Sequence, residues 1–259
     1  MSLLAPEVYV VSGNLISAAP SVASPTVLDD MLDSNLLCQL AADKKFGSRF
    51  IDPAAWLDVY RTSLGKVFWK ISNSHTVSYP VPPLIRSVSV MGVLEQTFFK
   101  VLDRDLRHQL EADIELLMEQ PITSPGSLLF NAKSHVQFIK DVRSSFDTPC
   151  ESVINLQISV AHDDAAVSVC SIYFKTAEPV GHDLFNQKFK VRELLGNISV
   201  SSFEANLLET SYEGIRQQIK DKLGAANIRE NIWLIADRPV ALQGTPHAGA
   251  RQFLEALDI

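Results

Sequence analysis

Hydrophobic and polar residues alternate in the middle of the chain, over residues 153–160. The apolar positions are Ile154, Leu156, Ile158 and Val160, and the polar positions between them are Asn155, Gln157 and Ser159. A period of two predicts a β-strand with one face buried and the other toward water or polar neighbours. Residues 166–174 are apolar on both faces, which predicts a central strand, and the polar residues 162–164 favour a tight turn. The pattern therefore predicts a hairpin over residues 153–175.

Other segments repeat their apolar residues at helical spacing. They predict helices over residues 26–46, 52–65, 93–119 and 128–144, and a short one over 248–257. The strongest signal, 93–119, predicts one long amphipathic helix or two in line. Ser201 and Glu204 precede another helical pattern, so they predict a capping box that opens a helix ending at Gly224. Short strands are expected over residues 7–12, 66–79, 184–191, 198–203 and 229–236.

Together these elements predict an α+β fold in a single domain, residues 1–259. We expect an antiparallel sheet centred on the hairpin at 153–175 and covered by amphipathic helices. The start of the chain differs, because small residues broken by Pro20 and Pro25 precede the first helix. This composition predicts a flexible N-terminal arm over residues 1–26.

Charge and cysteine content narrow the classes of function. A formal charge of -7 makes the average surface repel phosphate, and the lysines and arginines stand beside acidic residues, so no nucleic-acid partner is predicted. Three cysteines without paired spacing make no disulfide framework, which favours a reducing compartment. The first residues lack the pattern of a secretory signal. We therefore expect a cytoplasmic protein, or one exported without a cleavable signal.

Candidate chemistry rests on a few scattered side chains. A nucleophilic cysteine needs a histidine base, and the candidates for such a site are Cys150, His162 and His182. Imidazole and carboxylate groups also suit a transition metal, and the candidate ligands are His162, Asp163, Asp164, His182 and Asp183. The turn itself explains the first three of these without any metal. Neither a glycine-rich nucleotide loop nor a GxSxG motif occurs, so no cofactor is predicted.

Several stretches carry a resemblance to other proteins. LLCQLAADKKF (residues 36–46), DPAAWLDVY (52–60) and LGKVFWKI (64–71) resemble the helix–helix–strand opening of a group of uncharacterised bacterial proteins. VCSIYFK in the hairpin and the later SYEGIRQQIKDKLG are similar to the second half of the same group. The resemblance covers about half of the chain, and residues 227–248 form an insertion relative to the group. It implies a shared architecture and no particular catalytic residue or cofactor.

Three functions follow as hypotheses. The first is a non-enzymatic protein that self-associates, or binds another protein, through an edge strand and the apolar segment 18–26. The second is a lipid-binding or toxin-like virulence protein whose amphipathic segment 93–119 contacts a membrane. The third is a hydrolase that uses Cys150 or a metal at His162.

Overall fold

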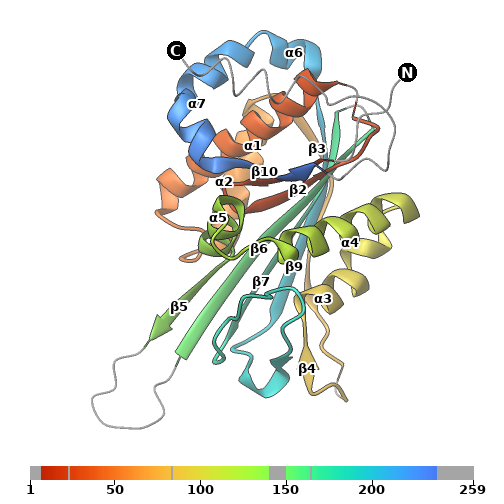
Figure 1. Ribbon diagram of the computed structural model, residues 1–259, viewed down its shortest axis with the longest axis vertical. Helices are drawn as coiled ribbons and strands as arrows, with labels where there is room; N and C mark the ends of the chain where they lie inside the picture. The colour runs from red at the N-terminus through yellow and green to blue at the C-terminus, as the bar shows by residue number, and fades with distance from the viewer. Residues whose placement is uncertain (1–6, 23, 83, 140–149, 164, 238–259) are drawn as a thin grey trace.

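The protein has an α+β fold, in which helices cover both faces of a mostly antiparallel sheet (Figure 1). The computed structural model describes residues 7–22, 24–82, 84–139, 150–163 and 165–237. Within these residues an eight-stranded sheet has the order β10-β1-β2-β6-β7-β9-β3, and β5 also pairs with β6. Its strands are β1 (Glu7–Val11), β2 (Asn14–Ala18), β3 (Trp69–Tyr79), β5 (His135–Ile139), β6 (Cys150–His162), β7 (Ala166–Thr176), β9 (Ile198–Leu207) and β10 (Ile232–Asp237). A small second sheet pairs β4 (Ser87–Val88) with β8 (Phe189–Lys190).

The hairpin predicted at 153–175 is confirmed and lies near the centre of the sheet. Strands β6 and β7 pair antiparallel from Ser152 opposite Thr176 to His162 opposite Ala166. Asp163 turns the chain between them with a φ of 40°, in the left-handed region that Asp tolerates better than most residues. Strand β7 lies between β6 and β9, as expected for a strand that is apolar on both faces.

An arm was expected over residues 1–26, but the described residues 7–22 do not form one. Residues 7–18 form the hairpin β1–β2, and β2 pairs in parallel with β6. Gly13 turns this hairpin with a φ of 87°, and a Cβ there would lie 2.2 Å from the Cβ of Lys133. The following Ala19 and Val22 are buried. Small apolar residues that looked like a linker thus fill space in the core.

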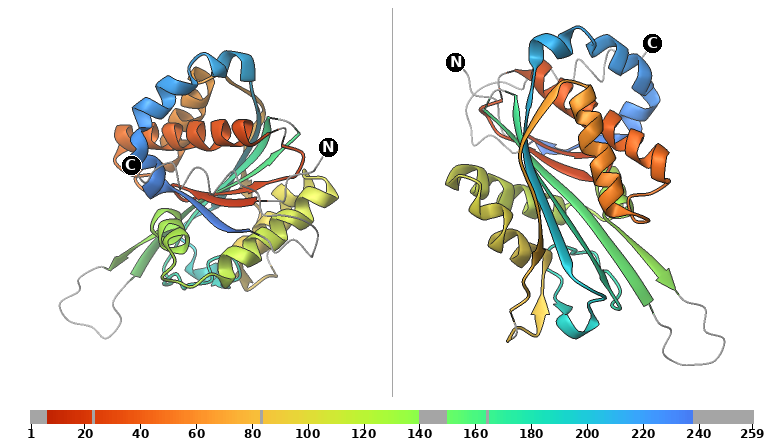
Figure 2. Two further views of the ribbon diagram at one scale, coloured as in Figure 1. Left: turned by 45° about the horizontal axis from the view of Figure 1, so that its top comes forward. Right: turned by 180° about the vertical axis from the view of Figure 1, so that it is seen from behind.

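Two helical layers enclose the sheet. The helices are α1 (Pro25–Phe46), α2 (Pro53–Lys66), α3 (Val90–Gln96), α4 (Arg104–Glu119), α5 (Pro125–Ser134), α6 (Glu209–Glu213) and α7 (Arg216–Asn231). Figure 2 shows α1, α2, α6 and α7 on one side of the sheet and α3 and α4 on the other. In the described part of the chain no helix is both long and apolar enough to cross a membrane. We call the first side the α1 face and the second, which also packs against α5, the α4 face.

The long helix expected over 93–119 is broken. Helix α3 ends before Thr97, a short 3-10 turn follows at Phe98–Lys100, and α4 begins after Asp103. The Asp103 side chain accepts hydrogen bonds from the backbone N–H groups of Asp105 and Leu106, so it caps a new helix inside the apolar pattern. One hypothesis from the sequence is that the apolar side chains of this segment contact a membrane. In the structure Leu110, Ile114 and Leu117 of α4 are buried in a core that they share with the sheet.

Three other sequence expectations need correction. Helix α5 ends at Ser134, and β5 replaces the second half of the helix expected over 128–144. Ser201 and Glu204 lie inside β9 and form no capping box, because pairing with β3 and β7 overrides the local signal. Gly224, which was expected to end a helix, has φ and ψ of 72° and 147° outside the helical region, so it kinks α7 and separates two helical segments within Arg216–Asn231. The strand expected over 184–191 is reduced to β8, and the helix expected over 248–257 lies outside the described residues.

Candidate functional site

The structure separates the cysteine and histidines that the sequence suggested. Cys150 is the first residue of β6 and His162 is the last of its 13 residues. At about 3.3 Å per residue these two lie roughly 40 Å apart. His182 follows β7, toward the same end of the sheet as Cys150, while the side chain of Cys150 and all of Asp164 lie outside the description. His162 and Asp163 are therefore not brought together with His182 and Asp183, and among the described residues no group of three His, Cys, Asp or Glu side chains could hold a metal ion.

His162 instead contacts a serine that the sequence analysis did not single out. Its Nε2 lies 3.0 Å from the Oγ of Ser168, and its Nδ1 lies 3.1 Å from a carboxylate oxygen of Asp163. Ser168 lies on β7 opposite Val160, two residues before His162. Hairpin register could have found this contact, because residues diagonal across two strands are within reach of a long side chain. The three residues form a Ser–His–Asp chain at the tip of the β6–β7 hairpin.

A second histidine–serine pair joins β3 to β9. The Nε2 of His75 lies 2.9 Å from the Oγ of Ser202, and its Nδ1 lies 3.3 Å from the backbone carbonyl of Asn73. The pairing of β3 with β9 is irregular between Ser72 and His75, and Asn73 has a φ of 49°. The Asn73 amide donates to Glu204 at 2.7 Å, which holds this bulge on β9. Bulges of this kind re-aim a side chain, here the imidazole of His75.

The His75–Ser202 pair opens into a cavity. Its volume is about 140 Å³, and its other lining residues are Val77, Thr97, Phe98, Val101 and Val200. The break between α3 and α4 builds one wall, because Thr97, Phe98 and Val101 belong to that break. Phe98 and Val200 are buried, whereas Val77 and Val101 are 42% and 61% exposed. The cavity therefore has an apolar lining with a histidine–serine pair in its wall.

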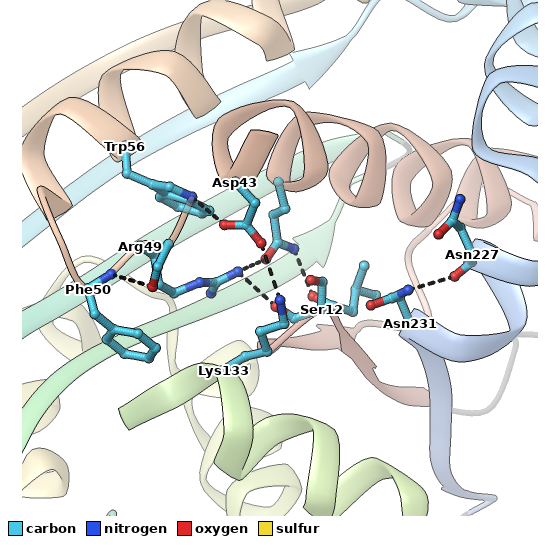
Figure 3. Close-up of polar contacts among 11 residues, drawn as sticks. Ser12, Asp43, Arg49, Phe50, Trp56, Lys133, Asn227 and Asn231 are labelled. Atoms are coloured by element: carbon cyan, nitrogen blue, oxygen red, sulfur yellow. Dashed lines mark hydrogen bonds and ion pairs between the residues drawn. The ribbon is translucent and has the colours of Figure 1, made fainter. Parts of the chain in front are cut away.

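Arg49 is the centre of a buried polar network under the α1 face (Figure 3). The residue is 2% exposed, and its Nη2 donates to the carbonyl of Ser12 at 2.8 Å and to Oε1 of Gln39 at 2.6 Å. Its guanidinium lies over the ring of Trp56, 4.5 Å from the centroid. Burial lowers the pKa of Arg49 to about 10, which still leaves it charged at neutral pH.

Neighbouring helices join this network. Asp43 on α1 accepts from Nε1 of Trp56 at 2.7 Å and pairs with Nζ of Lys133 on α5 at 3.3 Å. The network thus ties α1, α2 and α5 to the sheet, as Figure 3 shows for Arg49, Asp43 and Lys133. Among the residues that the structure describes, the Nε and Nη1 of Arg49 have no hydrogen-bond partner. Its contacts hold elements together, and we assign it a structural role.

A groove between α3 and α4 is strongly acidic. It has a volume of about 380 Å³, and its lining residues are Met91, Glu95, Glu111, Ile114, Glu115, Met118, Glu119 and Asn186. Glu111 also pairs with Arg107 at 2.9 Å. The remaining carboxylates make this part of the surface repel anions.

One end of the sheet exposes apolar side chains in neighbouring loops. Tyr79 at the end of β3 pairs with Ile198 at the start of β9, so the loop after β3 and the loop before β9 are adjacent. Leu84 in the first loop is 97% exposed, and Leu195 in the second is 46% exposed. We define the apolar end as Leu84, Ile85, Phe138 and Leu195. Strand β5, which contains Phe138, and strand β4, which follows Leu84 and Ile85, are drawn in the lower part of Figure 1.

The apolar end has a small excess of cations over acids among the described residues. The cations near it are Arg86, Lys175, Lys188, Lys190 and Arg192, and the acids near it are Glu151, Glu178, Asp183 and Glu193. Lys175 lies 3.2 Å from Glu151, Lys190 lies 3.4 Å from Glu178, and Arg192 lies 3.1 Å from Glu193. Five cations against four acids give this end a slight positive charge, while the whole chain has a formal charge of -7.

Comparison with known proteins shows likeness in structure alone. No protein-family model and no curated protein sequence matches the chain. The activated Cyt2Ba monomer from Bacillus thuringiensis subsp. israelensis aligns with a TM-score of 0.42 and 9% identity, over 76% of this chain and 98% of that chain. A delta-endotoxin aligns with a TM-score of 0.37 and 12% identity, over 80% of this chain and 86% of that one. The Evf virulence factor aligns with a TM-score of 0.34 and 8% identity, over 89% of this chain and 85% of that one. These neighbours are toxin-like proteins at low identity, and we draw no functional conclusion from likeness at this level.

Proposed function

We propose that this protein binds lipid membranes peripherally through the apolar end. The observation that supports the proposal is the nearly complete exposure of Leu84 in a loop beside a second exposed leucine, Leu195. A leucine side chain in water forgoes about 1.5–3 kcal/mol that burial would provide. The interface of a bilayer offers that burial without the need for a spanning helix.

Charge at the apolar end favours anionic lipid. Arg86 follows the exposed Leu84 and Ile85 directly in the chain, and Lys188, Lys190 and Arg192 lie in the segment that pairs beside it. A lysine or arginine near an anionic bilayer contributes about 1 kcal/mol to binding. The acidic groove between α3 and α4 would be repelled by the same surface. Only one orientation of the molecule therefore suits an anionic bilayer.

This route differs from the amphipathic segment that the sequence suggested. Most of the apolar side chains of α4 are buried, so they can contact lipid only if the helices of the α4 face move away from the sheet. The apolar end needs no such rearrangement. Docking of this kind suits the toxin-like alternative, in which contact with a membrane precedes damage to it.

Vesicle flotation tests the proposal. The full chain is mixed with vesicles of neutral lipid alone or with a fraction of anionic lipid, and the bound fraction is measured at low and high salt. We expect binding to anionic vesicles that salt weakens, and at least a tenfold weaker binding for Leu84→Asp. Release of a trapped dye, measured on the same vesicles, reports damage separately from docking.

Two matched variants control for hydrophobicity and charge. Ile51 is 74% exposed but lies in the connection between α1 and α2, so Ile51→Asp should bind like the wild type. Arg86→Glu should weaken binding, and Lys222→Glu on α7 makes the same charge change away from the apolar end. The proposal is wrong if the wild type does not float, or if Leu84→Asp and Ile51→Asp have equal effects.

Self-association through an edge strand stays a prediction. Strand β3 is at the edge of the described sheet, and its residues 73–78 are exposed. The segment 18–26, expected to share in the contact, is largely buried in the monomer through Ala18, Ala19 and Val22. Light scattering on the wild type and on Val77→Lys would show whether the β3 edge joins two copies.

A further inference from the structure

We infer that the cavity between β3, β9 and the break after α3 binds a small, uncharged apolar molecule of the size of one aromatic ring. This site is independent of lipid binding at the apolar end. The cavity has a volume of about 140 Å³. Four of its seven lining residues are apolar, namely Val77, Phe98, Val101 and Val200. The nature of the ligand follows from the polar atoms of the wall, from the exposure of the mouth and from the volume.

The polar atoms of the wall already have partners in the protein. Oγ1 of Thr97 donates to the carbonyl of Val93 at 2.6 Å, and Oγ of Ser202 lies 2.9 Å and 3.4 Å from the two ring nitrogens of His75. A buried water is held by about three polar partners, whereas an apolar cavity stays dry and takes apolar ligands. Because these polar groups are already paired, they hold a water weakly. An apolar molecule that displaces such a water gains affinity.

Two valines at the mouth leave apolar surface in contact with solvent. Val77 is 42% exposed on the edge strand β3, and Val101 is 61% exposed directly after the 3-10 turn. Beneath them, Phe98 and Val200 are buried and form an apolar floor. A ligand in this hollow covers apolar side chains that otherwise contact water, so the hydrophobic effect drives its binding.

The volume limits the size of the ligand. An apolar protein cavity of about 150 Å³ holds one benzene molecule or a xenon atom. The cavity of this protein has nearly the same volume, so it has room for about six carbon atoms. A molecule with two fused rings exceeds that volume, and so does the acyl chain of a membrane lipid. The ligand is therefore a free small molecule and not a lipid.

Hydrogen bonds hold the walls in place before a ligand arrives. Val77 pairs directly with Val200 across β3 and β9. On the opposite wall, the N–H of Val101 donates to the carbonyl of Phe98 at 3.1 Å and closes the 3-10 turn. A preformed site uses none of its binding free energy to order its walls. A small molecule that makes few contacts can therefore still bind.

The acidic groove between α3 and α4 is the competing site. It is larger, with a volume of about 380 Å³, but Glu95, Glu111, Glu115 and Glu119 line it beside its apolar side chains. An uncharged apolar molecule would remove water from these carboxylates without offering them hydrogen bonds, which is unfavourable. We therefore place the ligand in the cavity and use the groove as the internal control.

Titration of benzene into the ¹⁵N-labelled full chain, followed by NMR, tests the inference. We expect saturable shifts of the amide signals of residues 97–101 and 198–202, and none for residues 115–119 beside the groove. Naphthalene, which has two rings, and benzoate, which is charged, should bind at least tenfold more weakly than benzene. Ser202→Ala should bind benzene as the wild type does, because its hydroxyl is not a partner of the ligand.

Two substitutions at exposed positions test the location without changing the core. Val101→Trp would fill the mouth and should weaken benzene binding at least tenfold. Ile122→Trp, at a position that is 56% exposed and does not line the cavity, should bind benzene like the wild type. The inference is overturned if benzene causes no saturable shift at residues 97–101, if benzoate binds as tightly as benzene, or if the two Trp variants bind equally. Vesicle binding is measured without benzene, so neither result decides the other.

Discussion

The two faces of the sheet are both buried, yet they are built from different side chains. On the α4 face the core is apolar and includes paired aromatic rings, such as Phe130 with Phe185 and Phe174 with Phe189. On the α1 face an apolar core surrounds a fully buried arginine, Arg49, and buried amides. Most of the buried polar groups lie on the α1 face, whereas on the α4 face Ser17 donates to the buried carboxylate of Asp113 at 2.6 Å.

The alternating residues of strand β6 follow this difference between the two faces. Its polar residues were expected to face water or polar neighbours, and they face polar neighbours beneath helices. Asn155 donates to the carbonyl of Arg49 at 2.7 Å, and Ser159 pairs with Asn14 at 2.9 Å. A buried amide costs little when hydrogen-bonded and about 1–3 kcal/mol when left without a partner. Alternation along a strand therefore marks the chemistry of its two faces, and not which of them meets solvent.

The largest loss of stability should come from a substitution in the core of the α4 face. Phe174→Ala removes a buried ring that contacts Phe189 edge to face at 5.1 Å. We expect the free energy of unfolding to fall by about 3–5 kcal/mol, as is typical for a buried phenylalanine. Urea unfolding followed by circular dichroism measures it. Phe138→Ala, at a half-exposed ring, is the control, and equal losses for the two variants would contradict an apolar core on the α4 face.

On the α1 face, replacing Arg49 with Ala and with Met should lower the free energy of unfolding by different amounts. Arg49→Ala leaves the carbonyl of Ser12 and the amide oxygen of Gln39 without their donor, and we expect a loss of about 3 kcal/mol. Arg49→Met leaves the same two oxygens without a donor, but it keeps a long side chain over Trp56 and avoids a cavity, so it should lose less, about 1–2 kcal/mol. Urea unfolding of both variants tests this. A Met variant as unstable as the Ala variant would mean that the hydrogen bonds of the guanidinium, and not the space it fills, stabilise the fold.

Asp33 gives the α1 face a pH dependence. Burial raises its pKa to about 6, against the lowering effect of Lys220 on α7 and with repulsion from Asp29 and Asp30. Since this value exceeds that of an unfolded aspartate, about 3.9, the folded state binds the extra proton between these values. The contribution of Asp33 to stability is therefore complete below about pH 4 and is lost as pH rises through 6.

Asp33→Asn should remove that dependence. At pH 8 the variant should be more stable than the wild type by about 2 kcal/mol, and near pH 4 the two should be equal. Unfolding in urea at both pH values measures the difference, with Asp221→Asn on the exposed side of α7 as the control. A variant that is less stable at pH 8 would show that the contact with Lys220, 3.9 Å away, outweighs burial.

The smallest loss of stability should come from removing the side chains that cap helices, and this loss should be similar on the two faces. Asp103 caps α4 on one side of the sheet by accepting from the N–H groups of Asp105 and Leu106, and Asp52 caps α2 on the other by accepting from that of Ala55. Replacing either with Ala should cost about 1 kcal/mol. Thermal unfolding of the two variants compares them. Unequal costs would mean that the layers differ in more than the composition of their cores.

Elements with local signals could be predicted from the sequence. The hairpin at 153–175 follows from alternation, α1 follows from apolar spacing, and α2 follows from apolar spacing and from Asp52 and Pro53 at its start. The place of β2 could not be predicted, because its parallel partner lies more than 130 residues away. The same holds for the capping box, since Ser201 and Glu204 are read correctly only when the strands beside them are known.

The contacts of the candidate site residues could be predicted only where the residues are neighbours in the chain. His162 and Asp163 are neighbours in the chain, so their contact needs no knowledge of the fold, but the contact with Ser168 needs the hairpin register. His75 and Ser202 are 127 residues apart and meet through a bulge that no motif announces. Part of the wall of the cavity beside them comes from the break between α3 and α4, through Thr97, Phe98 and Val101.

The pairing of β1 with β10 joins the first described strand to the last. During synthesis β1 and β2 leave the ribosome long before β10, so one border of the nascent sheet stays open until the final strand arrives. Contacts of such long range slow folding and leave an unpaired edge exposed meanwhile. We expect the sheet to be completed only after β10 has been synthesised. Until then the free edge of β1 is the place where chaperones would have to prevent aggregation.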